Sequence, residues 1–425
     1  MQDNFVKKMA DFEVLLGYYT SRVICRPLIP PEHVYFSLTN RCNLRCKMCE
    51  ISKDSTPEES ELPTDKVKDI IMQIKNMGIN HIIFSGGEPL LRKDLLEIIK
   101  FAHENNIQMV DLITNGTLLD DALIRELIAA GLNHMGISID GLSQISSNIR
   151  GPGVFEKIIN NINKINLYKS KNNTPLPSLG INFTIMGENV SDMLPLVDLA
   201  KKINCLFISF QPVLFNNTKM YMNKKNTLWP DARRISDLRN VIKQLLKIKK
   251  ESKGVNIFTD ADVLNSLPDY FLGRRPQADF KCYEAIKRIV ITCAGQLWSC
   301  QGILGDLNKN TLSQIWHSDK TKKVRQDIKK CRRHCLQDCV YFPSDILKIA
   351  KNITQPNFLS LSSWKDGPQA RLMEKIDFYI GVLSENKRIK GDIFSKVFHI
   401  YALNSARNKL IAAKKYFLNK YTSAC

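Results

Sequence analysis

Short apolar runs alternate with longer amphipathic stretches over the first 250 residues. The runs are four to six residues long and rich in β-branched or aromatic side chains, which is typical of buried strands. The sequence therefore predicts six strands, at Val34–Leu38, His81–Phe84, Met109–Ile113, His134–Ile139, Gly180–Ile185 and Cys205–Phe210.

The stretches between these runs have the period of an amphipathic helix. Residues 65–77, for example, carry apolar side chains at positions 67, 70, 71, 74 and 77. Asp231 is a candidate N-cap for the last helix of the series. The expected helices are Asp65–Met77, Lys93–Glu104, Asp121–Ala130, Phe155–Tyr168, Ser191–Ile203 and Asp231–Lys250.

Six strand–helix units in a row predict an α/β fold with a parallel sheet and helices on its outside. Six strands are fewer than the eight that close a TIM barrel, so we expect a partial (β/α)6 TIM-like barrel. In such sheets, functional residues lie at the carboxyl ends of the strands.

The alternation stops after about residue 250, which predicts a change of domain. We expect an N-terminal helical lead at 1–33, the barrel at 34–252 and a linker at 253–280. A small cysteine-rich domain is expected at 281–342, where six cysteines and a hairpin-like stretch occur, and a basic helical extension at 343–425.

Composition adds a strong positive charge to this picture. The apolar fraction of 44% is ordinary for a globular protein, but 61 Lys and Arg against 42 Asp and Glu give a net charge of +19. Residues 343–425 contribute +8, from 14 basic and 6 acidic residues. The excess either favours an anionic partner or only keeps the protein soluble.

Twelve cysteines in a chain without a recognisable signal peptide favour metal binding or redox chemistry over a disulfide framework. No segment reaches the roughly 18 consecutive apolar residues of a membrane span. We expect a cytoplasmic protein. The apolar and basic mixture in its C-terminal extension leaves peripheral contact with an anionic membrane surface as an alternative to simple helix docking. Nucleic-acid binding is disfavoured, because no known module or aromatic-basic platform occurs.

Three cysteines follow the first expected strand directly, at Cys42, Cys46 and Cys49, with the spacing C-x3-C-x2-C. Three thiolates on one tight loop can ligate three irons of a [4Fe–4S] cube and leave the fourth iron open. A zinc site would want a fourth ligand at short spacing, but the next histidine is His81.

This motif and its context resemble the radical S-adenosylmethionine (SAM) superfamily. The second strand ends in Ser85-Gly86-Gly87-Glu88-Pro89, which resembles the family's GGE motif. The third ends in Thr114-Asn115-Gly116 and the fourth in Ser138-Ile139-Asp140-Gly141, which are similar to segments that line the SAM site. The resemblance covers residues 34–210.

The resemblance implies a set of SAM contacts. Gly86, Gly87 and Glu88 are expected at the SAM amino group, because glycines expose backbone groups to a ligand. Contacts to the ribose and carboxylate are expected from Thr114, Asn115, Ser138 and Asp140. A tight turn is the alternative explanation for the glycine pair and for Asp140-Gly141. Some relatives carry a basic residue before an Asn in the fifth strand, but this chain has Gly180-Ile181-Asn182, so the partner of the SAM carboxylate is left open.

The later cysteines resemble the SPASM/Twitch extension of radical SAM enzymes, which carries auxiliary [4Fe–4S] clusters. The similar features are C-x12-G-x4-C from Cys282 to Cys300, an Ile-Trp-x-Ser segment at 315–318 and a late run at Cys331, Cys335 and Cys339. Two fully ligated clusters need about eight thiolates, so six favour one auxiliary cluster. Cys282 and Cys300 are the firmest ligands, with Cys331 and Cys335 preferred to Cys339. Cys293 is expected to pack in the hairpin and His334 to be solvated. A structural zinc site remains the alternative.

The resemblance implies an oxidoreductase that cleaves SAM reductively to a 5′-deoxyadenosyl radical, which abstracts hydrogen from a substrate. The auxiliary cluster would assist oxidation, and a one-electron donor protein would supply the reductant. We expect a small substrate, anionic or lipid-linked. Peptide modification is an alternative substrate class. A non-catalytic metal- or cluster-binding scaffold with a basic docking tail is the alternative function, although such a scaffold has no need of Gly86-Gly87-Glu88.

Overall fold

The computed structural model describes residues 2–51, 58–213, 228–251, 254–274, 281–332, 335–336 and 341–342. The chain divides into two units, one formed by residues 1–29 with 343–425 and the other by residues 30–342. The described part of the first unit contains one long helix, α1 (Gln2–Ile24). The predicted extension at 343–425 lies outside the described residues.

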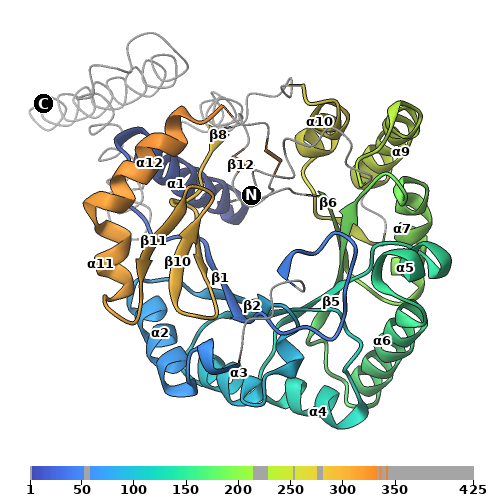
Figure 1. The fold of residues 1–425 in the computed structure, drawn as a ribbon, viewed down its shortest axis with the longest axis horizontal. Helices are drawn as coiled ribbons and strands as arrows, with labels where there is room; N and C mark the ends of the chain where they lie inside the picture. The colour runs from blue at the N-terminus through green and yellow to red at the C-terminus, as the bar shows by residue number, and fades with distance from the viewer. Residues whose placement is uncertain are drawn as a thin grey trace, which may run out of the picture. The chain divides into compact units, whose positions relative to one another are not determined.

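All six predicted strands are present in the second unit, and they pair in parallel in chain order (Figure 1). They are β1 (His33–Thr39), β2 (His81–Gly86), β3 (Met109–Thr114), β4 (His134–Ser138), β5 (Ser178–Ile185) and β6 (Phe207–Pro212). This order and the outer helices confirm the α/β fold class with a parallel sheet.

Helices cover the outer face of this sheet (Figure 1). In α2, for example, Val67, Ile70, Ile71 and Ile74 form the buried stripe that the sequence period predicts. The helices after successive strands are α2 (Thr64–Asn76), α3 (Leu95–Glu104), α4 (Asp121–Ala129), α5 (Ser143–Arg150) with α6 (Val154–Lys171), α7 (Met193–Lys202) and α9 (Ala232–Glu251). Helix α5 was not expected from the sequence.

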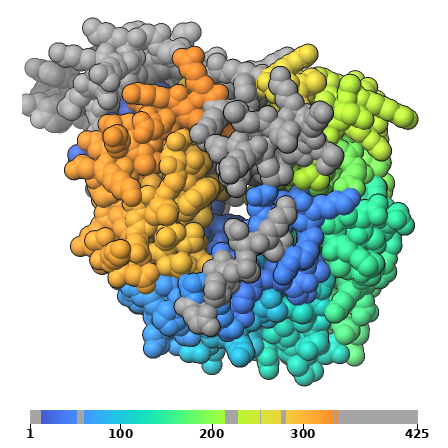
Figure 2. All heavy atoms as spheres, viewed as in Figure 1, coloured from blue at the N-terminus to red at the C-terminus, as the bar shows by residue number. Residues whose placement is uncertain are grey.

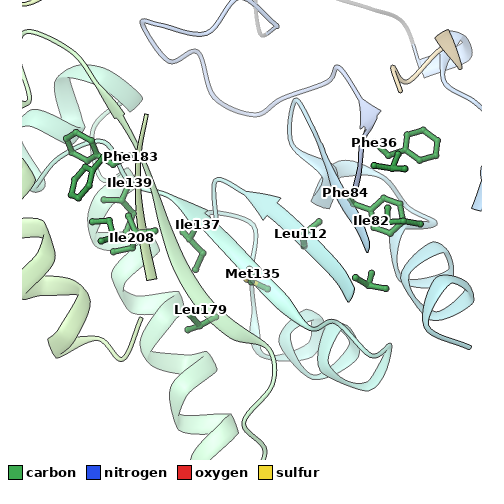
Figure 3. Close-up of a cluster of buried hydrophobic side chains, with 14 of the residues drawn as sticks. Phe36, Ile82, Phe84, Leu112, Met135, Ile137, Ile139, Leu179, Phe183 and Ile208 are labelled. Carbon is green, nitrogen blue, oxygen red and sulfur yellow. The ribbon is translucent and has the colours of Figure 1, made fainter. Parts of the chain in front are cut away.

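The hydrophobic core lies between the sheet and the helices. Figure 3 shows alternate strand residues such as Leu112, Ile137 and Ile208 gathered there, and all three are fully buried. The residues between them face the other way. Ser138 pairs with Asn182 and Asn182 pairs with Ser209, so these three polar side chains share the inner face of the sheet.

The region 253–280, expected to be a linker, contains regular structure. A short strand, β7 (Asn256–Ile257), pairs in parallel with β6, and α10 (Ala261–Phe271) follows. The strand is too short for its periodicity to be visible, and Pro268 inside the helix disguises the helical pattern. The parallel sheet therefore has seven strands in this part of the described chain.

The cysteine-rich region extends the same sheet. Strands β9 (Arg288–Ile291), β10 (Gln296–Ser299) and β11 (Gly302–Asp306) form an antiparallel meander, and β9 pairs in parallel with β1. The resulting order is β11-β10-β9-β1-β2-β3-β4-β5-β6-β7. The predicted small domain therefore starts as an added edge of the barrel sheet, next to the strand that precedes Cys42.

The meander is followed by two helices, α11 (Leu312–His317) and α12 (Asp319–Lys330). A capping box between Thr311 and Gln314 begins α11, and the Ser318 side chain caps α12. A separate two-stranded pair joins β8 (Lys281–Cys282) to β12 (Tyr341–Phe342). Among the described helices, none combines the length and hydropathy that crossing a membrane requires.

Candidate functional site: the cysteine loop and its surroundings

The loop after β1 brings Cys42, Cys46 and Cys49 together. Burial raises the pKa of Cys46, which is 8% exposed, and the neighbouring Cys49 and Cys42 raise it further while Arg150 lowers it. Burial also raises the pKa of Cys42, and the Leu44 N–H, which donates to its sulfur at 3.5 Å, opposes the shift. The three thiols are thus close enough for the charge on one to affect the pKa of another.

The donor set fits an iron–sulfur cluster. Within the described ranges, no three His, Cys, Asp or Glu side chains are grouped as ligands of a single metal ion. A [4Fe–4S] cube needs one thiolate on each of three irons, and soft thiolates are the ligands that such clusters prefer. The chemistry of three mutually interacting thiols on one loop therefore suits a cube with one open corner.

The glycine turn after β2 packs against the cysteine loop. The Gly87 and Glu88 N–H groups donate to the carbonyl oxygens of Thr39 and Arg41, both at 2.7 Å. A Cβ atom on Gly86 would lie 2.1 Å from the Thr39 oxygen, and one on Gly87 would lie 2.2 Å from the Arg41 oxygen. Glycine is required at both positions because two backbone segments touch there.

Glu88 is fully buried and its carboxylate links β2 to β3. It accepts hydrogen bonds from Thr114 Oγ1 and the Asn115 N–H, both at 2.7 Å, and from the Leu90 N–H at 3.1 Å. Burial raises the pKa of Glu88, and these hydrogen bonds work against the rise. The structure thus gives Glu88 and Thr114 partners within the protein. Their contact with SAM stays a prediction.

Asn115 connects β3 to the cysteine loop. Its Nδ2 donates to Asn43 Oδ1 at 2.9 Å, and Asn43 donates in turn to Thr117 Oγ1 at 2.9 Å. Thr117 closes the ring by donating to Asn115 Oδ1 at 2.7 Å. Asn43 and Thr117 were not predicted from the sequence. Asn43 lies 72 positions before Asn115 and 74 positions before Thr117, and only folding of the chain brings these residues into contact.

The Asp140 carboxylate anchors the segment that follows β4. It is fully buried, accepts a hydrogen bond from the Thr184 N–H at 2.6 Å and forms an ion pair with Arg150 at 2.5 Å. Ser138, two residues earlier, remains partly exposed on the inner face of the sheet. Ser138 is therefore the one of these two residues that is accessible to a ligand.

Arg150 is a site residue that the sequence did not indicate. Its Nη1 lies 3.8 Å from Cys46 Sγ, and the carbonyl of neighbouring Ile149 accepts from the Lys47 N–H at 3.0 Å. Its buried Nε has no hydrogen-bond partner among the described residues. Arg150 ends α5, a short helix with three Ser and one Asn, residues of low helix propensity, and Gly151 in a positive-φ conformation (φ 117°) follows it.

A second group of thiols forms in the cysteine-rich region. Burial raises the pKa of Cys282 strongly, and the charges of Glu284, Cys300 and Cys335 raise it further, which places both cysteines near Cys282. Cys300, Cys331 and Cys335 are exposed. Cys339 and His334 lie outside the described residues, so the preference for Cys331 over Cys339 stays a prediction.

Cys293 is buried in the turn between β9 and β10, at 2% exposure, and its carbonyl accepts a hydrogen bond from the Leu62 N–H at 2.8 Å. Burial raises its pKa, as does Glu61, while a backbone hydrogen bond from Asn40 lowers it. Figure 2 shows orange atoms of the cysteine-rich region and blue atoms of the early chain on the same face of the molecule.

Comparison with known proteins agrees with this arrangement. Residues 36–200 match the radical SAM superfamily, and residues 282–339 match an iron–sulfur cluster-binding domain called SPASM. Relatives include two proteins of Methanosarcina barkeri. The Fe-coproporphyrin III synthase is 29% identical over 53% of this chain, and the match spans 54% of that protein's length. The AdoMet-dependent heme synthase is 26% identical over 72% of this chain and 87% of its own.

Among solved structures, Streptococcus suis SuiB bound to S-adenosylmethionine has the same fold. The TM-score is 0.55 at 16% identity, and the match covers 70% of this chain and 68% of SuiB. The two matched domains imply a SAM-binding [4Fe–4S] cluster, SAM itself and an auxiliary cluster. Residues 36–200 therefore form a radical SAM superfamily domain, and residues 282–339 form an iron–sulfur cluster-binding domain.

Proposed function

We propose that the protein is an enzyme that binds a [4Fe–4S] cluster through Cys42, Cys46 and Cys49 and cleaves SAM reductively at it. The convergence of these three thiols beside Arg150 and the glycine turn is the observation that carries this proposal. When bound, the cluster and SAM supply a 5′-deoxyadenosyl radical that abstracts hydrogen from the substrate.

The surrounding residues bind and orient SAM. The partnerless Nε of Arg150 offers a buried donor for the SAM carboxylate, a role that the sequence left open. Asp140 holds the guanidinium in place. Gly86 and Gly87 let the turn pack against the backbone of Thr39 and Arg41, just before Cys42, and the partly exposed Ser138 is available to the ribose.

We propose that Cys282, Cys300 and Cys335 hold the auxiliary cluster together with one further cysteine. A cluster ligated by four protein thiolates has no open iron, which favours electron transfer over substrate binding. Exposed Cys300 and Cys335 put this cluster near the protein surface, where a one-electron partner protein can exchange electrons with it.

The proposed substrate is a small anionic molecule. The net charge of +19 attracts anions, and the two Methanosarcina relatives are named for tetrapyrrole products, which supports a carboxylated small molecule as a substrate class. Peptide modification is the second candidate, because SuiB has also been solved with its precursor peptide SuiA bound.

The test is anaerobic purification followed by incubation with SAM and a strong reductant. Release of 5′-deoxyadenosine together with bound iron and sulfide supports the proposal. A Cys46→Ala variant should release none, whereas Cys205→Ala, which changes a buried cysteine between α7 and β6, should match the wild type. Bound zinc without SAM cleavage in the wild type would contradict the proposal and favour a scaffold.

A further inference from the structure

Glu61 connects the cysteine loop to the cysteine-rich region. Its side chain is 7% exposed, and its carboxylate accepts hydrogen bonds from Thr39 Oγ1, from Arg41 Nε at 2.9 Å and from Arg41 Nη2 at 3.1 Å. Thr39 and Arg41 are the third and first residues before Cys42. A buried carboxylate is costly unless it is paired and hydrogen-bonded, so this geometry fixes the start of the loop.

The turn between β9 and β10 contacts the same place from the other side. The carbonyl of Cys293 accepts from the Leu62 N–H at 2.8 Å, one residue after Glu61. The Cys293 thiol lies near enough to Glu61 and to the Asn40 backbone to be affected by both. Residues 61–62 therefore lie between this turn and the residues that precede Cys42.

Arg92 fixes this short segment against the barrel. Its Nη2 donates to the Leu62 carbonyl at 2.7 Å and its Nη1 donates to the Leu38 carbonyl at 3.0 Å, while Asp94 pairs with its Nε at 2.7 Å. Leu38 belongs to β1, so the segment is tied to the strand that carries the loop. Glu61 is thus a fixed group against which the loop is placed.

The contacts divide between side chains and backbone. Glu61 binds the side chains of Thr39 and Arg41, whereas the glycine turn binds the carbonyls of the same two residues. The cysteine loop is therefore held in position on two sides. The glycine turn of the proposed SAM site holds one side, and the segment 61–62, which contacts the β9–β10 turn, holds the other.

We propose that Glu61 is a positioning residue that fixes the cysteine loop relative to the β9–β10 turn, and so couples the cysteine-rich region to the SAM site. The inference rests on the proposed function. It assigns Glu61 no contact with SAM or substrate. It predicts that changing Glu61 alters the SAM-binding cluster and leaves the auxiliary cluster unchanged.

The test uses electron paramagnetic resonance of the reduced holoprotein with and without SAM, together with the SAM dissociation constant. Glu61→Gln keeps the size of the side chain but turns an amide N–H towards the donors of Arg41. We expect a shifted signal of the SAM-binding cluster and a dissociation constant raised roughly 10- to 100-fold, as for other partners that orient metal ligands. A variant lacking Cys42, Cys46 and Cys49 identifies the auxiliary signal.

Glu97→Gln is the matched control, because it removes a surface ion pair with Lys68 on the outer helices. Thr39→Val is a second variant, which deletes one donor to Glu61 and should shift the signal in the same direction by a smaller amount. An unshifted signal with wild-type SAM affinity in both Glu61→Gln and Thr39→Val overturns the inference. Parallel loss of both cluster signals in these variants overturns it too, because it would indicate a general role in stability. Absence of SAM cleavage in the wild type would instead remove the proposed function itself.

Discussion

Arg150 lies with its Nη1 3.8 Å from the sulfur of Cys46, although 104 residues of sequence separate the two. Its guanidinium also pairs with the fully buried Asp140 at 2.5 Å. One cation thus faces both a predicted cluster ligand and the carboxylate that follows β4. Through Arg150, the charge of the cysteine loop is therefore linked electrostatically to the carboxyl end of β4.

Removing one member of the Asp140–Arg150 pair should be strongly destabilising. Arg150→Met leaves Asp140 buried and unpaired, so the free energy of unfolding should fall by about 3–5 kcal/mol. The double variant Asp140→Asn/Arg150→Met should recover part of that loss. Urea unfolding of the two single variants and the double variant measures the coupling. Strict additivity would show that the pair does not interact, and Arg125→Met, at an exposed position on α4, controls for loss of a surface arginine.

Gly87→Ala should displace the cysteine loop. The added Cβ would lie 2.2 Å from the Arg41 carbonyl oxygen, a backbone atom that cannot move without shifting the segment before Cys42. We expect loss of most of the iron of the first cluster, measured by iron analysis after anaerobic reconstitution. Gly153→Ala is the control, because its Cβ meets nothing within 4 Å and its left-handed backbone costs only about 1–2 kcal/mol. Equal iron content in the two variants would contradict the expected displacement.

Cysteines of the cysteine-rich region should differ in their effect on iron content. Cys282→Ala should reduce roughly eight irons per chain to roughly four, because one [4Fe–4S] cluster is lost. Cys293→Ala, in the turn between β9 and β10, should keep the wild-type count, since its thiol lies beside Glu61 and Asn40. Loss of a cluster in Cys293→Ala would contradict the ligand assignment.

Stability should fall in acid because of a histidine at the amino end of β1. Burial lowers the pKa of His33 from 6.5 to about 3, and the positive neighbours His81, Arg288 and Lys287 add to the shift. The unfolded chain therefore binds a proton that the folded chain does not, so stability is full above the unfolded pKa of about 6.5 and falls as the pH drops toward 3.

His33→Gln should flatten this pH dependence, measured as the urea midpoint between pH 7.5 and pH 5. Gln cannot be protonated, so only the contribution of His33 disappears. His103→Gln, at an exposed position on α3, should leave the slope unchanged. The same slope in His33→Gln and the wild type would refute the assignment to His33.

The barrel strands and the cysteine loop could be predicted because their signals are local. Runs such as His81–Phe84 predict buried strands without any other information. The three cysteines Cys42, Cys46 and Cys49 all lie within one stretch of eight residues. The first strand, the glycine turn and the thiols needed no tertiary information.

The residues that the sequence did not reveal owe their role to distant contacts. Arg150 lies on a short helix whose sequence has low helix propensity. Nothing in the local sequence distinguishes Glu61 from other acidic loop residues, and its role follows from its hydrogen bonds with Thr39 and Arg41. Glu88 was expected at the SAM amino group, and its carboxylate is found linking β2 to β3. Local pattern cannot reveal such partners, because hydrogen bonds across the sheet depend on strand register.

The most direct measurement is electron–nuclear double resonance of the reduced protein with SAM labelled with ¹⁵N in its amino group and ¹⁷O in its carboxylate. We expect hyperfine coupling from both labels in the wild type, because three thiolates leave one iron open to SAM. Reduced protein that retains its first cluster but shows no coupling from either label would refute SAM binding at that iron.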